Sequence, residues 1–234
     1  MRVNRAARAY HAGYIAIYKA GIRLVDATRP TALLADFMKR QRPGGRRVVE
    51  FGCGEGRDAI FLAKRGFRVV ALDTSPAALA RARRRAREEG VRVRFVVADM
   101  SGPFEFPDAS FDLAATIDSF HFITNTGART RHAHEVYRIL KPGGLWFFCN
   151  HVAKHASRGR GHGMEWVAVR TSRGDERIRV PRVPYLVGTK EGYVRLCRDA
   201  GFAIRTARVT RTSPINARVA LIVATKPAAR RGTL

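Results

Sequence analysis

A glycine-rich loop lies where an apolar β-type segment ends and a helical segment begins. The stretch reads Val48-Val49-Glu50-Phe51-Gly52-Cys53-Gly54-Glu55-Gly56-Arg57-Asp58. Glycines at such a junction let the backbone turn sharply and approach a ligand that a Cβ atom would keep away. The free N–H groups at the start of the following helix favour the anionic part of a ligand. The loop therefore predicts a binding site for a nucleotide-like molecule.

A carboxylate, Asp73, ends the second β-type segment, 21 residues beyond Gly52. A carboxylate at this distance can accept hydrogen bonds from both ribose hydroxyls of a nucleotide-like ligand. The dinucleotide pattern G-x-G-x-x-G fails, because Arg57 stands where the third glycine belongs. The spacing is instead G-x-G-x-G with Glu50 two residues ahead of it. This spacing argues against a nucleotide-dependent oxidoreductase, which remains an alternative of a different class.

Two further motifs follow, which are Val97-Ala98-Asp99-Met100 at the end of strand three and Ile139-Leu140-Lys141-Pro142-Gly143-Gly144-Leu145. Together with Glu50-x-Gly52-x-Gly54-x-Gly56 and with Asp73 at the end of strand two, they form four motifs in order. On these motifs the chain, over roughly residues 45–150, resembles class I S-adenosylmethionine-dependent methyltransferases, in particular the small free-standing members of that family. The resemblance implies a Rossmann-like fold, S-adenosyl-L-methionine as cofactor and S-adenosyl-L-homocysteine as product.

The resemblance also implies which residues hold the cofactor. The glycines would lie against its methionine moiety, and Glu50 would orient their loop. Asp73 would hold the ribose hydroxyls with Thr74 beside the adenine, which Asp99 and Met100 would also contact. Ile117 would lie near the transferable methyl group. The implied cofactor-binding residues are Glu50, Gly52, Gly54, Gly56, Asp73, Thr74, Asp99, Met100 and Ile117.

Two histidines are candidates for proton transfer, since a base is needed only if the acceptor must lose a proton. His121 and His151 each follow the carboxyl end of a strand, where ligands of open α/β sheets bind. A packing role is the alternative for both. We expect His132 and His134 on a solvated helix surface. Because His151, His155 and His162 are irregularly spaced and have few carboxylates or thiols nearby, the sequence predicts no metal site.

The order of segments predicts an α/β protein. Strand-type and helix-type segments alternate from Arg47 to Cys149, which favours a doubly wound, mostly parallel sheet. The strands expected over 204–210 and 218–224 are joined by a short turn, so they should be antiparallel. Alternating residues around Ser172–Asp175 predict an added β-hairpin. We therefore expect a seven-stranded sheet with a terminal antiparallel pair and a hairpin excursion.

We expect one methyltransferase domain over residues 1–234. Its parts would be N-terminal helices forming a lid (1–42), the cofactor-binding core (43–150), an acceptor-side excursion (151–188), and a C-terminal helix with antiparallel strands (189–226). The expected acceptor-binding residues come from the lid, the end of strand four and the excursion. They are Tyr14, Tyr18, Asp118, Trp166 and Tyr185.

The composition is that of a globular protein with an unusual charge. The chain has 234 residues, 44 Lys+Arg against 19 Asp+Glu, and a net charge of +25. Such a charge attracts phosphates or nucleic acid, but it also follows from the arginine usage of a GC-rich genome. The 3 cysteines show no paired spacing, and no apolar stretch is long enough to span a bilayer. We expect a cytoplasmic protein without a membrane partner; a mitochondrial presequence at the N-terminus is the alternative.

The acceptor is open between a small molecule and RNA. The excursion carries eight cations and three acids, a net +5, together with aromatic residues that would line a pocket or stack on bases. We favour a small molecule, because no appended RNA-binding module is recognisable. The segment Ile117-Asp118-Ser119-Phe120 also differs from the N/D-P-P-Y/F tetrapeptide of many amino-methylating nucleic-acid enzymes. A non-catalytic cofactor-binding protein is a further alternative.

Overall fold

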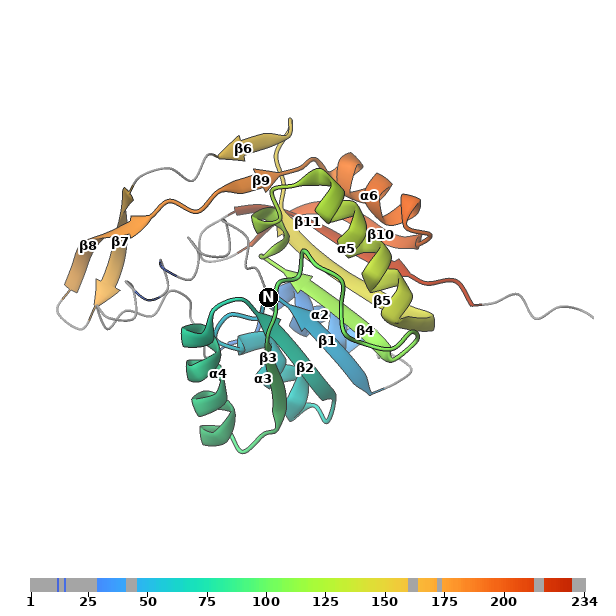
Figure 1. Ribbon diagram of the computed structural model, residues 1–234, viewed down its shortest axis with the longest axis horizontal. Helices are drawn as coiled ribbons and strands as arrows, with labels where there is room; N and C mark the ends of the chain where they lie inside the picture. Colours follow the sequence, from blue (N-terminus) through green and yellow to red (C-terminus); the bar gives the residue numbers. More distant parts are fainter. Residues whose placement is uncertain are drawn as a thin grey trace, which may run out of the picture.

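The computed structural model describes residues 12, 15, 29–40, 46–159, 164–171, 174–212 and 217–228. At its centre is a seven-stranded sheet with the order β10-β11-β5-β4-β1-β2-β3 (Figure 1). Its strands are β1 (Arg47–Phe51), β2 (Arg68–Asp73), β3 (Val93–Val97), β4 (Phe111–Ile117), β5 (Leu140–His151), β10 (Ala203–Thr212) and β11 (Ala217–Thr225). Strands β1 to β5 run parallel, and β11 is antiparallel to both of its neighbours. The predicted fold class is confirmed.

Helices cover both faces of this sheet (Figure 1). They are α2 (Ala32–Arg40), α3 (Arg57–Lys64), α4 (Pro76–Glu88), α5 (Thr126–Ile139) and α6 (Lys190–Asp199), with a short 3₁₀ helix η1 (Phe120–Phe122). Side chains of α2, α3 and α4 pack with one face of the strands, and side chains of α5 and α6 with the other. In β1, Val48 belongs to the first core and Val49 to the second. The central strands are apolar on both faces because both are covered.

The start of α5 is fixed by a cap, and the start of β5 contains an irregularity. Helix α5 begins at Thr126, where the Asn125 side chain accepts a hydrogen bond from the backbone N–H of Ala128 and caps the helix. Strand β5 begins at Leu140, so the segment Lys141-Pro142-Gly143-Gly144 lies inside it. Gly143 has φ +81° there, and the pairing of β4 with β5 shifts between Phe111 and Leu113.

Two small sheets lie outside the main one. The predicted hairpin is present as β7 (Met164–Thr171) and β8 (Gly174–Pro181), which pair antiparallel and project from the body of the molecule (Figure 1). A second pair, β6 (Ser157–Gly159) and β9 (Tyr185–Val187), is antiparallel and was not predicted. These strands have three residues each, too few for the alternation that identifies a strand in a sequence.

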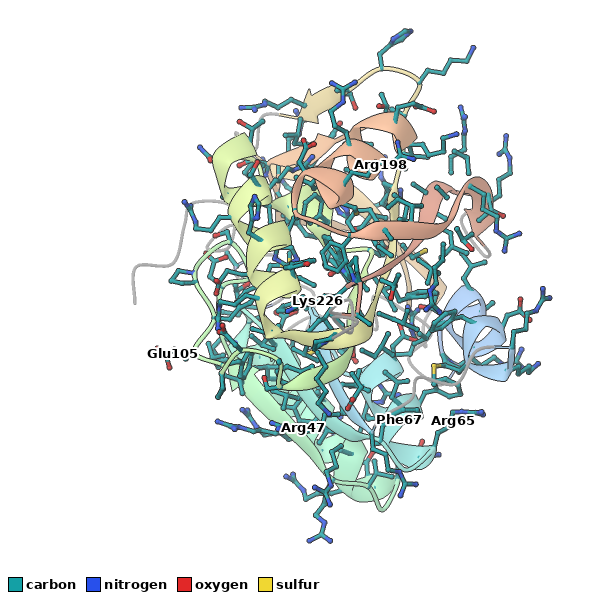
Figure 2. The ribbon with its side chains drawn as sticks, turned by 90° about the vertical axis from the view of Figure 1, so that its right-hand side faces the viewer. Arg47, Arg65, Phe67, Glu105, Arg198 and Lys226 are labelled. Carbon is teal, nitrogen blue, oxygen red and sulfur yellow. The ribbon has the colours of Figure 1, made fainter. Side chains whose placement is uncertain are left out.

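Lys226, just after β11, fixes the C-terminal end of α5. Its ammonium donates to the carbonyl oxygens of Tyr137 at 2.9 Å and Leu140 at 2.8 Å. Figure 2 places Lys226 beside the end of that helix. A cation at a helix C-terminus satisfies carbonyls that have no partner within the helix and complements the helix dipole.

Among the described residues, no helix combines the length and the apolar composition needed to cross a membrane.

Candidate active site

The glycine loop connects β1 to α3 in a conformation that only glycine adopts readily. Gly52, Gly54 and Gly56 have φ values of +71°, +54° and +75°. A Cβ atom on Gly52 would overlap the Ser119 side chain and lie 2.7 Å from its Oγ. The loop is therefore packed directly against the residue that follows the end of β4, and the contact leaves no room for a side chain at Gly52.

Asp73 ties the glycine loop to the end of β2. Its carboxylate is buried and accepts hydrogen bonds from the backbone N–H of Gly54 and that of Ser75, each at 2.8 Å. Thr74, between Asp73 and Ser75 in sequence, is half-buried and lies at the turn into α4. Asp73 is thus placed at the carboxyl ends of adjacent parallel strands, as the sequence predicts, and it also organises the loop itself.

Glu50 is a buried carboxylate that lacks part of its hydrogen bonding. Only 3% of the residue is exposed, and Oε2 has no hydrogen-bond partner in the described part of the chain. Burial raises the pKa of this carboxyl well above its usual range, and the nearby carboxylates of Asp58 and Asp73 raise it further. A buried oxygen without a partner is unfavourable, so this position suits a ligand that brings a donor or a positive charge. The ammonium group of S-adenosylmethionine fits that requirement.

The predicted adenine-side residues lie in the turn that follows β3. The Asp99 carboxylate accepts a hydrogen bond from the backbone N–H of Ser101 at 2.8 Å. Met100 is half-buried, and its methyl carbon lies 3.8 Å from the position that a Cβ on Gly52 would take. The turn after β3 and the glycine loop therefore stand side by side, as a shared ligand requires.

His132 is buried, so the expectation of a surface position was wrong. The ring is fully buried in contact with Phe51, Phe104 and Phe120, and Nδ1 donates to the carbonyl of Met100 at 2.7 Å. Arg129 on the same helix is also buried. Because the neighbours of His132 in the sequence are charged, the sequence pattern did not indicate that this face of α5 is buried. The hydrogen bond joins the helix to the turn that carries Asp99 and Met100.

His132 makes stability sensitive to acid. Burial lowers its pKa to about 4, although Asp99 and Glu135 act in the opposite direction. The unfolded chain takes up a proton near pH 6.5, so stability should fall between pH 6.5 and 4, by about 3 kcal/mol for this group. Urea unfolding across this range should show a smaller loss in His132→Gln. His134→Gln, at an exposed position of the same helix, should behave as the wild type; equal slopes in all three proteins would contradict the assignment.

Strand β4 ends in a turn that Asn150 holds from the neighbouring strand. Asp118 follows the buried Ile117 with φ +50°, which is unusual for a residue with a side chain. The Asn150 Oδ1 accepts from the backbone N–H groups of Ser119 at 2.9 Å and Phe120 at 2.8 Å. Its Nδ2 donates to the carbonyl of Thr116 at 3.0 Å. The role of Asn150 was not predicted from the sequence, because it depends on the pairing of β5 with β4.

Both catalytic candidates lie beside Asp118. The Asp118 Oδ1 is 2.8 Å from Nε2 of His151 and 4.0 Å from Nδ1 of His121. The hydrogen bond to Asp118 raises the pKa of His151, whereas burial lowers the pKa of His121 to about 4. His151 is therefore the more basic of the two imidazoles. The three side chains could hold a metal ion, although the histidine spacing predicted none.

The other predicted acceptor-binding residues are placed only in part. Tyr185 lies on β9 with 42% of its surface exposed, and its ring stands against Gly159 of β6. Trp166 lies on β7 opposite Arg179 of β8. Tyr14 and Tyr18 lie outside the described residues.

Two residues that sequence analysis missed attach β9 beside the histidines. The buried Arg129 guanidinium donates to the carbonyls of Leu186 on β9 and of Ile123, the latter at 2.7 Å. The Tyr193 hydroxyl donates to the carbonyl of His151 at 3.1 Å and accepts from the N–H of Gly188 at 2.8 Å. The last part of the excursion is thus anchored over η1 and the end of β5. No local motif marks either residue.

The strand order, the glycine loop and the acids after β2 and β3 define the class I Rossmann-like methyltransferase fold. Residues 48–144 match the family model described as a methyltransferase domain. The resemblance found in the sequence is therefore confirmed for this segment.

Individual curated relatives match less than half of the chain. The demethylmenaquinone methyltransferase of Thermus thermophilus is 41% identical over 101 residues, which are 42% of this chain and 44% of that protein. The S-adenosyl-L-methionine-dependent Diels-Alderase of Talaromyces variabilis is 35% identical over 107 residues, 44% of this chain and 35% of that protein. The chain thus spans less than half the length of these curated relatives.

A solved structure extends the likeness of fold to most of the chain. It is the 1,6-didemethyltoxoflavin-N1-methyltransferase of Burkholderia thailandensis, crystallised with 1,6-didemethyltoxoflavin and S-adenosylhomocysteine. Its TM-score is 0.67 at 20% identity, and the alignment covers 97% of this chain and 92% of that one. At this identity the comparison supports the fold and leaves the acceptor open.

Proposed function

We propose that this protein transfers a methyl group from S-adenosylmethionine to a small-molecule acceptor. The observation that carries the proposal is the arrangement of Glu50, the glycine loop and Asp73 at the carboxyl ends of β1 and β2. Gly52 lies so close to Ser119 that a Cβ atom there would overlap its side chain, and Glu50 offers a buried oxygen without a hydrogen-bond partner among the described residues. The match of residues 48–144 to a methyltransferase domain supports the same reading.

Each cofactor-binding residue has a distinct task in this proposal. Glu50 would hold the ammonium group, and the glycine loop would let the methionine moiety approach the backbone. Asp73 would accept from the ribose hydroxyls, while Asp99, Met100 and Thr74 would surround the adenine. Ile117 would close the methionine end. Bound S-adenosylmethionine supplies an electrophilic methyl group on a sulfonium, and the protein contributes alignment of the acceptor with it.

The acceptor would approach over the carboxyl ends of β4 and β5. His121, His151 and Asp118 stand there, and an acceptor with a hydroxyl group must lose a proton on transfer. Tyr14, Tyr18, Trp166 and Tyr185 would add aromatic surface from the lid and the excursion. Displacement of water from this edge would keep the acceptor aligned.

The charge distribution supports a small molecule over RNA. In Figure 2, Arg198 of α6 lies in the upper part of the molecule, far from Arg47 of β1 and Arg65 at the end of α3, which lie in the lower part. Arg83 and Arg85 on α4 donate to the backbone carbonyls of Phe95 and Glu55, so part of their hydrogen bonding is used within the fold. A site that follows a nucleic-acid backbone instead needs cations gathered along one groove.

The direct test combines cofactor titration with detection of the methylated product. We expect isothermal titration to show one site for S-adenosylhomocysteine and no site for NAD. Transfer of labelled methyl from S-adenosylmethionine should reach small hydroxylated, aminated or thiol-bearing compounds in a screen. Because one relative carries the name of a Diels-Alderase, the label in the product distinguishes methyl transfer from other cofactor-dependent activity. Binding of NAD alone, or labelling of RNA alone, would overturn the proposal.

Replacing Asp73 by asparagine should weaken the binding of S-adenosylhomocysteine by about 10- to 150-fold. The variant removes the negative charge that strengthens the hydrogen bonds to the ribose, a loss of about 1.5–3 kcal/mol. Calorimetric dissociation constants measure this effect. Asp108→Asn is the matched control. Asp108 lies just before β4, outside the proposed cofactor site, and its exposed carboxylate forms an ion pair with Arg138. Unchanged affinity in the Asp73 variant would exclude this carboxylate from the cofactor site.

A further inference from the structure

We propose that Asp118, His121 and His151 form a binding site for a divalent transition-metal ion at the carboxyl ends of β4 and β5. The ligands would be one carboxylate oxygen and two imidazole nitrogens. The site requires only residues of this chain. Its use in catalysis rests on the proposed methyl transfer.

The three ligand atoms lie close together. They lie within 4.8 Å of one another, and the Asp118 Oδ1 is 2.8 Å from His151 Nε2 and 4.0 Å from His121 Nδ1. Zinc lies about 2.0–2.2 Å from such ligands, so two ligand atoms on one ion are at most about 4.4 Å apart. A small approach of the rings would therefore complete the site.

The buried His121 supplies a second, independent observation. Only 11% of its side chain is exposed, and Nδ1 is buried without a hydrogen-bond partner in the described part of the chain. A buried polar atom that lacks a partner is unfavourable, and each such case in a folded protein calls for an explanation. The lone pair of a neutral imidazole at this position is available to a metal ion. Coordination would satisfy the atom.

The backbone holds the ligands in place without a metal ion. Asp118 keeps its left-handed conformation through a hydrogen bond from its N–H to the Cys149 carbonyl at 2.8 Å. The Asn150 side chain accepts hydrogen bonds from the backbone N–H groups of the two residues after Asp118. The Tyr193 hydroxyl donates to the carbonyl of His151. Strained residues held by several contacts are typical of functional sites. The site is thus formed on a strand end and a braced turn instead of a mobile loop.

The donor set selects the kind of ion. Two imidazoles and one carboxylate suit Zn²⁺, Fe²⁺ or Co²⁺, whereas Mg²⁺ and Ca²⁺ prefer oxygen ligands alone. Three protein ligands leave a position open, as in catalytic sites and unlike closed structural ones. An acceptor hydroxyl placed there would ionise more readily, so the site would favour hydroxyl-bearing acceptors. A bound ion would also occupy the lone pairs through which the histidines could accept a proton.

The test is a Co²⁺ titration of the full chain, without a histidine tag, followed by visible absorption. We expect one equivalent of Co²⁺ with a ligand-field spectrum, displaced by Zn²⁺ and not by Mg²⁺. His151→Gln should weaken binding by more than about 100-fold, because loss of a direct ligand exceeds the 10–100-fold effect of losing a group that merely orients one. His121→Asn should do the same. His155→Ala, an exposed position beyond β5, should bind as the wild type does.

The outcomes separate the metal site from the proposed function. Thermal melting verifies that each variant is folded, and the half-exposed His151 is the safer position if His121→Asn unfolds. Absence of a stoichiometric ion in the wild type, or equal binding by His151→Gln, would overturn the metal site. S-adenosylhomocysteine titration of the same samples reports on the cofactor site. Intact cofactor binding without metal binding would leave the proposed methyl transfer standing.

Discussion

Gly52→Ala should bind S-adenosylhomocysteine more than 100-fold more weakly than the wild type. The backbone at Gly52 has φ +71°, and a Cβ atom there would overlap the Ser119 side chain. Either the glycine loop or the end of β4 must move, and both adjoin the expected methionine site. A displacement that costs about 3 kcal/mol of binding free energy corresponds to about 100-fold in the dissociation constant. Isothermal titration calorimetry below the melting temperature of the variant measures this dissociation constant.

Gly90→Ala separates backbone strain from this overlap. Gly90 has φ +66°, but a Cβ atom there has nothing within 4 Å. Both variants should lose about 1–2 kcal/mol of stability from the left-handed backbone. Only Gly52→Ala should lose cofactor affinity. If the two variants bind the cofactor equally well, the close packing of the glycine loop against Ser119 is not required for binding.

Asn150→Ala should lower the free energy of unfolding by about 3–9 kcal/mol and abolish the proposed methyl transfer. The change leaves two buried backbone N–H groups, those of Ser119 and Phe120, and the carbonyl of Thr116 without their side-chain partner. Each unsatisfied group costs about 1–3 kcal/mol. Because whole domains have about 5–15 kcal/mol of stability, the loss is a large share of the total. Urea unfolding provides the measurement.

Asn125→Ala is the matched control for this substitution. Asn125 also accepts a backbone hydrogen bond, from Ala128 at 2.9 Å, but it is exposed at the start of α5. Loss of this helix cap should cost about 1 kcal/mol and leave turnover nearly unchanged. Similar losses of stability for Asn125→Ala and Asn150→Ala would mean that Asn150 does not hold the turn after β4.

Local patterns were sufficient to predict the sheet and the cofactor loop. The strand–helix alternation and the short connection before β11 determine the direction of each strand, so the antiparallel pair is as predicted. The glycines and Asp73 could be identified because each lies at a strand end, a position set by short-range sequence. The hairpin β7–β8 likewise follows from alternation around a turn.

The remaining features depend on contacts between distant residues. Asn150 acts on the turn after β4, about 30 residues away in sequence. His132 looks like a surface residue among charged neighbours, and its burial follows from the packing of α5 on Phe51 and Phe104. His121 and His151 meet only because β4 and β5 are adjacent. Sequence spacing carries no signal for such pairs, which is why the histidine cluster was not predicted.

The position of β11 has a consequence for biosynthesis. This strand follows the other strands in the chain, yet it lies inside the sheet between β5 and β10. Its residues Ala220 and Val219 pair with Asn150 and His151 of β5. While the ribosome is still making the segment before β11, the edge of β5 has no partner and exposes groups that favour aggregation. The edge of β5 that carries the two proposed functional residues is therefore the last part of this sheet to be paired, and the proposed acceptor site can form only after β11 has emerged from the ribosome.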